Sequence, residues 1–156
     1  GSMRVGWWLM HYIEPANYHA IEPLRDRIDT AARLLGVRIN ASYNDDFTFP
    51  DVAVDFAIAR SVWSHASKIQ IAKMLSEFAR TATPGAGFLA SVRPATTEEE
   101  DYTGDEWVGK GPDSDDPGMV NHSLDWIETE GSRHGLTMKV YGELNSQTWV
   151  LIRSPR

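Results

Sequence analysis

The sequence predicts an α/β fold in which a mostly parallel, Rossmann-like sheet packs against helices. Apolar stretches of strand length alternate with segments of helical period, an order that is typical of parallel sheets. The last two strand-like stretches flank Asn145-Ser146, a suitable two-residue hairpin turn, so a C-terminal antiparallel hairpin is expected as well. With 156 residues, 42% of them hydrophobic and 24% charged, the chain is expected to form a single domain, residues 1–156.

The first part of the chain predicts a strand, a helix and a second strand. Residues 18–21 are a short apolar stretch that ends at Glu22. Residues 24–35 then show apolar side chains with helical period, and Gly36 can supply a left-handed helix cap. Residues 37–41 are the second predicted strand.

The remaining elements continue the alternation. The composition and periodicity predict strands at 54–59 and 87–92, helices at 67–82 and 124–134, and hairpin strands at 138–144 and 147–152. The turn residues Thr83-Pro84-Gly85 are expected to end the helix at 67–82 before the strand at 87–92 begins.

The net charge of −7 is concentrated in an acidic segment, residues 94–118, which holds nine acids and one lysine. No basic stripe is present, so nucleic-acid binding is disfavoured. A connection of this length is either functional or disordered. Tyr102 and Trp107 suit an aromatic lid, whereas Asp113-x-Asp115-Asp116 lacks the later glycine and glutamate of a calcium-binding loop.

Several classes of protein are disfavoured by composition. The chain has no cysteine, which excludes disulfides and thiolate metal sites, and no metal site is expected. No apolar run reaches the roughly 20 residues that span a bilayer. These features favour a cytoplasmic protein.

Four stretches together resemble the class I S-adenosylmethionine-dependent methyltransferases, whose fold is a Rossmann-like sheet of seven strands. Residues 18–23 look like the family's second strand with its terminal acid, and residues 55–65 are similar to its fourth-strand motif. Residues 74–89 resemble the helix, proline-glycine turn and fifth strand, and residues 135–150 resemble the closing elements. The order and spacing of these stretches carry the resemblance.

The resemblance implies methyl transfer from S-adenosylmethionine to an oxygen or nitrogen atom of a small molecule. It places an acid on the ribose hydroxyls, an acid and an apolar side chain at the adenine, and strand-end backbone at the methionine part of the cofactor. The expected cofactor-binding residues are Gly1, Ser2, Arg4, Glu22, Asp46, Phe47, Ala59 and Ser61. His65 is the expected general base, since its unperturbed pKa lies near neutrality.

The sequence departs from the family at its start. Residues 1–6 are similar to the tail of the family's glycine-rich loop, so we expect the chain to begin after the first strand. Gly1-Ser2 is also a common remnant of cloning, and both origins stay open. Because the first strand lies at the centre of this fold, a missing strand predicts a homo-oligomer, for example one with exchanged strands, or a rearranged sheet.

Each functional assignment has a structural alternative. Glu22 suits the start of a helix, Asp46 suits a solvated turn, and His65 suits a helix cap. His11 and His19 are expected to be core residues, as are Trp7, Trp8 and Trp63, although these tryptophans would also suit a substrate pocket.

Two other functions compete with methyl transfer. The first is a degenerate, non-catalytic member of the family that acts in binding or assembly. The second is a nicotinamide-dependent enzyme, which is the weaker alternative because no Gly-x-Gly-x-x-Gly follows any predicted strand.

Overall fold

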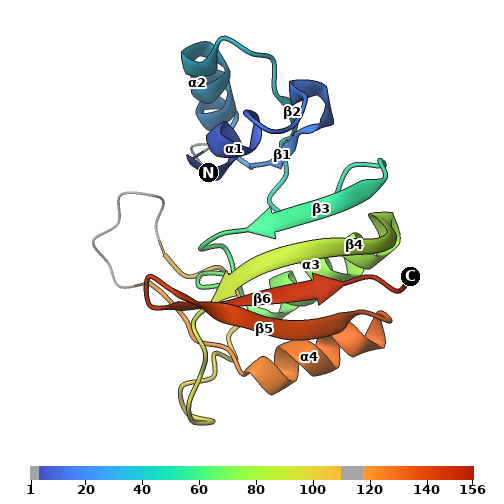
Figure 1. Ribbon diagram of the computed structural model, residues 1–156. Helices are drawn as coiled ribbons and strands as arrows, with labels where there is room; N and C mark the ends of the chain where they lie inside the picture. The colour runs from blue at the N-terminus through green and yellow to red at the C-terminus, as the bar shows by residue number, and fades with distance from the viewer. Residues whose placement is uncertain (1–3, 110–117) are drawn as a thin grey trace. The chain divides into compact units, whose positions relative to one another are not determined.

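The predicted α/β fold is confirmed by the computed structural model, which describes residues 4–109 and 118–156. The chain forms two compact units, residues 1–50 and 51–156, and each unit is described by itself (Figure 1). Within the described residues, no helix is long and apolar enough to cross a membrane.

The first unit is a two-stranded parallel sheet with helices. Its elements are α1 (Arg4–Leu9), a 3-10 turn (Pro15–Asn17), β1 (His19–Ile21), α2 (Arg25–Leu35) and β2 (Asn40–Ser42). β1 and β2 pair in register, with Ala20 opposite Ala41. Gly36 ends α2 in the left-handed conformation at φ 66°, as the sequence predicts, and its N–H donates to the carbonyl of Ala32.

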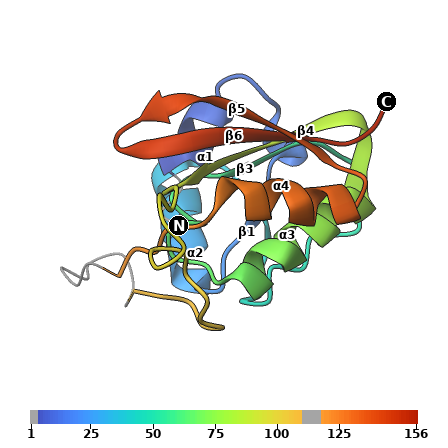
Figure 2. The ribbon, with the colours of Figure 1, turned by 90° about the horizontal axis from the view of Figure 1, so that it is seen from below.

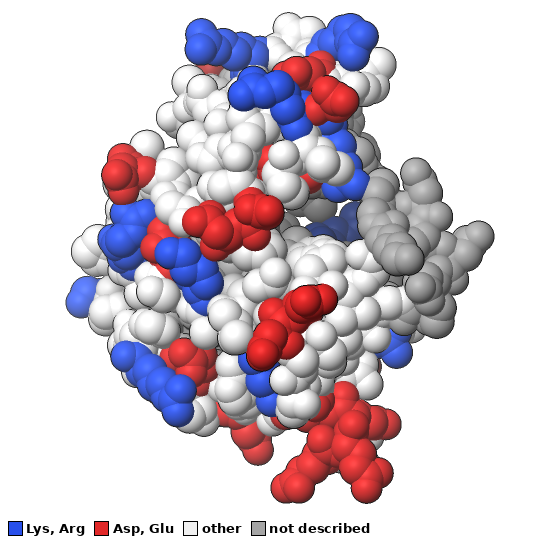
Figure 3. Space-filling view, turned by 180° about the vertical axis from the view of Figure 1, so that it is seen from behind, with Lys and Arg blue, Asp and Glu red and all other residues white. Residues whose placement is uncertain are grey.

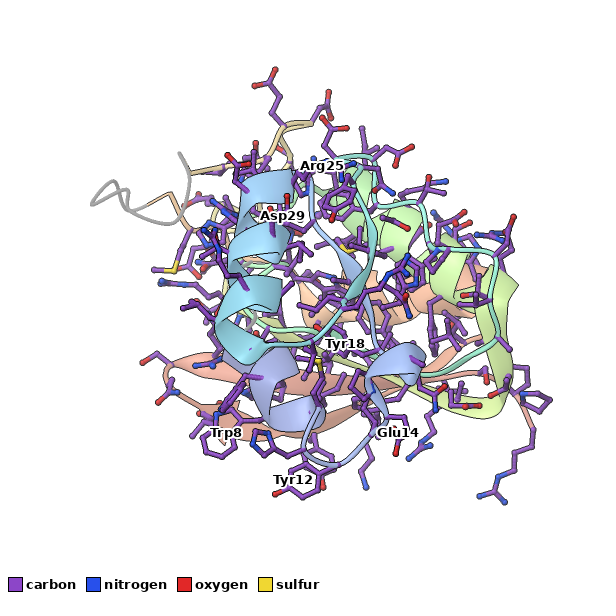
Figure 4. All side chains as sticks on the ribbon, turned by 90° about the horizontal axis from the view of Figure 1, so that it is seen from above. Trp8, Tyr12, Glu14, Tyr18, Arg25 and Asp29 are labelled. Carbon is purple, nitrogen blue, oxygen red and sulfur yellow. The ribbon has the colours of Figure 1, made fainter. Side chains whose placement is uncertain are left out.

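Some aromatic and histidine side chains of the first unit are exposed, and here the expectation of core packing is wrong. Trp7 and Trp8 are 42% and 65% exposed, since neighbouring residues of the six-residue α1 cannot both face a core. Figure 4 shows Trp8 and Tyr12 pointing away from the ribbon. His11 is exposed and hydrogen-bonds the carbonyl of Trp7, while His19 is exposed because β1 turns Ala20 inward.

The second unit is a four-stranded sheet with two helices. Its elements are β3 (Val54–Ala59), α3 (Lys68–Thr81), β4 (Ala82–Val92), α4 (Leu124–Arg133), β5 (Thr137–Leu144) and β6 (Gln147–Arg153). The strand order is β3-β4-β6-β5, in which β3 and β4 are parallel and the other pairs are antiparallel. Figure 2 shows α3 and α4 together on one face of this sheet.

An aromatic cluster forms the centre of this second core. Phe88 of β4 is 2% exposed, and its ring centroid lies 5.5 Å from that of Trp63 and 5.3 Å from that of Phe78. Trp63 is fully buried, so for this tryptophan the expectation of core packing is confirmed. Val150 and Ile152 of β6 are also fully buried, which continues the apolar layer across the sheet.

Local sequence signals account for the ends of most elements. Ser67 accepts a hydrogen bond from the Gln70 N–H, and the Gln70 side chain accepts one from the Ser67 N–H, a capping box that starts α3. Asn145 and Ser146 have φ of 54° and 58°, the left-handed pair that a tight hairpin turn requires, which confirms the predicted turn.

The fourth predicted strand is longer than expected. β4 begins at Ala82 rather than Gly87, because Ala82 pairs with Val54 and the Thr83 hydroxyl donates to the Asp55 carboxylate. The turn expected to separate helix from strand is therefore absorbed into β4, where Gly85 has φ of 80°.

Part of the acidic segment is tied to the second unit by backbone hydrogen bonds. Ala95 N–H donates to the carbonyl of His122, and Tyr102 N–H donates to that of Asn121. On the face shown in Figure 3, acidic side chains gather at the lower end and basic ones do not form a stripe. The calcium-like stretch, residues 113–116, lies outside the described residues.

Asp101 is the main side-chain anchor of this segment. One carboxylate oxygen lies 2.6 Å from the Lys68 ammonium on α3, and the other accepts the Ser123 N–H at the start of α4 at 3.0 Å. Burial alone would raise the pKa of Asp101, but the hydrogen bonds from Lys68 and Ser123 and the charge of Lys68 outweigh it, so the pKa is lowered.

Replacing Phe88 with alanine is expected to destabilise the second unit by about 3–5 kcal/mol, because it removes the ring that joins Trp63 and Phe78. Phe56→Ala is the matched control, since Phe56 is 51% exposed on the neighbouring strand and its loss should cost roughly 1 kcal/mol. Urea unfolding measures both; equal losses would contradict the description of the core.

Asp101→Asn should lower the free energy of unfolding at neutral pH by about 1–3 kcal/mol, since a charge-assisted hydrogen bond is lost. The folded-state pKa lies below the unfolded value of about 3.9, so the contribution is complete above that pH and disappears as pH falls through the folded value. The variant should therefore show a shallower loss of stability at acid pH than the wild type. Asp105→Asn, at an exposed acid of the same segment, is the control; identical acid profiles for the three proteins would contradict the role of Asp101.

Candidate functional site

The carboxyl end of β3 carries a constrained backbone. β3 ends at Ala59, which is 5% exposed, and Ser61 follows with φ of 53°, a left-handed conformation that costs a non-glycine residue of order 1–3 kcal/mol. The Ser61 N–H donates to the buried Ser91 hydroxyl at 2.8 Å. The side-chain amide of Gln147 donates to the Ser61 hydroxyl at 3.2 Å. Strands of open α/β sheets bind ligands at this end.

His65 lies in the loop between β3 and α3. Its imidazole is half-buried and stacks on Trp107, with ring centroids 5.5 Å apart and 22° between the ring planes. Its Nδ1 lies 3.0 Å from the carbonyl oxygen of Val108 and 2.7 Å from that of Gly118. The alternative that His65 caps the following helix is wrong, because Ser67 caps α3.

A second histidine of this unit, His122, has a different environment. It is fully buried, and its Nε2 lies 2.9 Å from the carbonyl oxygen of Ala66. Burial lowers the pKa of His122. This histidine is therefore a neutral part of the packing around the start of α3 rather than an exposed catalytic group.

Glu22 follows β1 in the first unit, and its side chain is 3% exposed. One of its oxygens accepts hydrogen bonds from the Leu24 N–H at 3.2 Å and from the Arg27 guanidinium at 3.3 Å. The carboxylate therefore serves the start of α2, as the structural alternative predicts. Its proposed contact with ribose hydroxyls stays a prediction.

Asp46 and Phe47 form a turn after β2. The Asp46 carboxylate accepts hydrogen bonds from both the backbone N–H and the hydroxyl of Thr48, at 3.1 and 2.9 Å. Phe47 has φ of 58°, another left-handed residue outside glycine. This is the turn chemistry that the alternative describes, and the contact with adenine stays a prediction.

The remaining predicted residues lie at the start of the chain. Gly1 and Ser2 are outside the described residues, and Arg4 is described only as the first residue of α1. Ala59, Ser61 and His65 belong to the second unit, whereas Glu22 and Asp46 belong to the first. Residues 4–109 and 118–156 contain no cluster of three or more histidine or acidic side chains that could hold a metal ion.

Sequence reasoning missed several residues around Ser61 and His65. Ser91 and Gln147 hydrogen-bond Ser61 across 30 and 86 positions of sequence, so no local pattern marks them. The signal at Gly118 is weak, because a glycine at the end of the acidic segment marks only a turn. Trp107 was expected to form part of a lid, and the structure places it on His65.

No protein-family model and no curated protein matches the sequence. Solved structures do match. An O-methyltransferase family protein from Burkholderia thailandensis has a TM-score of 0.62 and 12% identity over 87% of this chain and 42% of its own. A protein from Pyrococcus horikoshii OT3 has a TM-score of 0.69 and 13% identity over 100% of this chain and 78% of its own. PigF, solved with SAH, has a TM-score of 0.65 and 14% identity over 99% of this chain and 48% of its own.

The match to these structures concerns the fold and part of their length. The chain spans less than half the length of the Burkholderia protein and of PigF. At identities of 12–14%, the likeness shows the fold alone. The predicted methyltransferase-like α/β fold is therefore confirmed by the solved structures that the chain resembles.

Proposed function

We propose that the protein binds S-adenosylmethionine and transfers its methyl group to an oxygen or nitrogen atom of a small molecule. The observation that carries this proposal is that the backbone of Ser61 is strained and that the half-buried His65 follows it in the loop after the carboxyl end of β3. Backbone strain of this kind is typical of ligand-binding and catalytic positions. The fold supports the proposal, because the solved structures that resemble this chain include an O-methyltransferase family protein and PigF with SAH.

The residues present have chemistry that fits the cofactor. Glu22 supplies a carboxylate that can accept hydrogen bonds from ribose hydroxyls, and Asp46 supplies one for the adenine amino group. Backbone groups of Ala59 and Ser61 would hold the methionine part. Gly1, Ser2, Arg4 and Phe47 complete the proposed set.

His65 would remove the proton of the acceptor. S-adenosylmethionine supplies an electrophilic methyl group when bound. Held by backbone groups of Ala59 and Ser61, the cofactor would supply the methyl carbon together with a sulfur atom that can keep the electron pair of the carbon–sulfur bond. The acceptor's proton passes to Nε2 of His65, so the imidazole leaves the step positively charged. Alignment of acceptor, carbon and sulfur provides most of the acceleration, and His65 adds to it.

A non-catalytic binding module is the second candidate. It is favoured by the hydrogen bonds that the Glu22 carboxylate already makes to Leu24 and Arg27. Such a module would not transfer a methyl group to any acceptor.

Calorimetric titration with S-adenosylhomocysteine tests the proposed cofactor site. The wild type should bind, and Glu22→Gln should weaken binding about tenfold to hundredfold, because a carboxylate acceptor of the ribose hydroxyls is lost. Asp29→Asn, at an exposed acid of α2, should bind like the wild type. Thermal unfolding of both variants controls for loss of structure. Absence of binding at millimolar ligand by the folded wild type would contradict the proposal.

We also propose that the protein forms a homo-oligomer in which β1 or β3 gains a further strand. Among the described strands, β1 pairs only with β2, and β3 on its other side has no partner beyond β4. Parallel strands are usually found inside larger sheets, so these edges favour addition of a strand donated by a second copy of the chain. Light scattering after gel filtration should give a mass at least twice that of one chain, which is 17.5 kDa. A mass of one chain at micromolar concentration would contradict this assembly.

A further inference from the structure

We infer that two parts of the acidic segment, residues 107–109 and Gly118, hold the His65 imidazole in the tautomer that leaves Nε2 free to accept a proton. They are positioning residues, because they act through His65. The inference rests on the proposed role of His65 as proton acceptor, but the tautomer is a property of the folded chain and can be measured without cofactor or substrate.

The first step concerns the hydrogen-bond partners of Nδ1. The carbonyl oxygens of Val108 and Gly118 lie 3.0 and 2.7 Å from this nitrogen. A carbonyl oxygen can only accept, so Nδ1 must carry the hydrogen. In the neutral imidazole, Nε2 then keeps its lone pair. Nothing in the described part of the chain hydrogen-bonds Nε2 of His65.

The second step concerns the orientation of the ring. Trp107 stacks on one face of the imidazole, with 22° between the planes, and the neighbouring Val108 N–H donates to the His65 carbonyl at 2.8 Å. One short stretch therefore contacts the backbone, the ring face and the ring nitrogen of the same residue. Turning the ring over would exchange Nδ1 for a carbon atom next to both carbonyls and would break both hydrogen bonds.

The third step concerns two glycines that make this approach possible. Gly109 has φ of 107°, and a Cβ placed on it would lie 3.1 Å from Nδ1 of His65. A Cβ on Gly118 would lie 2.7 Å from the Cα of Gly109, which is backbone and cannot move aside as a side chain can. A hydrogen bond two residues further along also holds Gly118 near His65, because the Val120 N–H donates to the Ser64 carbonyl at 2.8 Å. Only glycine at both positions lets the two carbonyls meet at one imidazole nitrogen.

The fully buried His122 provides an internal contrast. Its Nε2 lies 2.9 Å from the carbonyl oxygen of Ala66, so this histidine must carry its hydrogen on Nε2. The same unit thus holds two histidines in opposite tautomers. The half-buried one leaves free the nitrogen that can act as a base, whereas the buried one does not.

The test is a two-bond ¹H–¹⁵N correlation spectrum of the histidine side chains in the whole, ¹⁵N-labelled protein at alkaline pH. His65→Gln and His122→Gln assign the two signals by their loss. His65 should show a protonated Nδ1 and an unprotonated Nε2, and His122 should show the reverse. A protonated Nε2, or exchange-averaged nitrogens, at His65 in the wild type would overturn the inference.

Three variants test which groups hold the tautomer. Gly118→Ala should move the His65 signals toward the averaged tautomers of free histidine and leave those of His122 unchanged. Gly142→Ala is the matched control, because a Cβ there meets nothing within 4 Å. Trp107→Ala should shift the signals in the same direction, and Trp107→Phe should restore them. An unchanged His65 spectrum in a folded Gly118→Ala protein would overturn the inference.

The wild-type spectrum decides the question even where a variant fails to fold. The same experiment separates the inference from the function on which it rests. A wild type that shows the expected tautomer and does not bind S-adenosylhomocysteine supports the inference and contradicts the proposed cofactor. A wild type that binds S-adenosylhomocysteine but shows averaged tautomers at His65 supports the proposed cofactor and contradicts the inference.

Discussion

The parallel pairing of β3 with β4 is the constraint on which the second unit depends. Its register sets Ala59 opposite Ala90, so the chain segments that follow both strands begin at one edge of the sheet. This is why the Ser61 N–H reaches the Ser91 hydroxyl, although the two residues are 30 positions apart in the sequence. The left-handed backbone at Ser61 is stable because this hydrogen bond and the one from Gln147 hold it. From that fixed point the chain turns through the buried Trp63 to His65 and α3.

The acidic segment has a structural part as well as a solvated one. Asp101 ties it to Lys68 and to the start of α4, and Val108 ties it to the backbone of His65. Its composition alone suggests a lid or a disordered insert, since it holds nine acids and one lysine. The described contacts connect it instead to the residue proposed as the base. The segment therefore links the packing of two helices to the orientation of one imidazole.

Local patterns predicted most of the helices and strands, but not the long-range contacts of Ser61 and His65. The capping box at Ser67, the left-handed cap at Gly36 and the hairpin turn at Asn145 are each decided by a few neighbouring residues, and each was predictable. The partners of Ser61 and His65 were not, because Ser91, Gln147 and Gly118 reach them through sheet register and chain reversal. The exposure of Trp8 was likewise not predictable, because hydrophobicity alone does not distinguish an apolar side chain in a core from one on the surface of a short helix.

We propose that the carboxyl end of β3 receives the methionine part of the cofactor. The most direct measurement is a ¹H–¹⁵N correlation spectrum of the backbone amides, recorded as S-adenosylhomocysteine is added. We expect concentration-dependent shifts at the amides of Ser61 and His65, with the amide of Gly142 on the exposed strand β5 unchanged. Saturable shifts confined to β5 and α4, or no shift at Ser61 at saturating ligand, would contradict it.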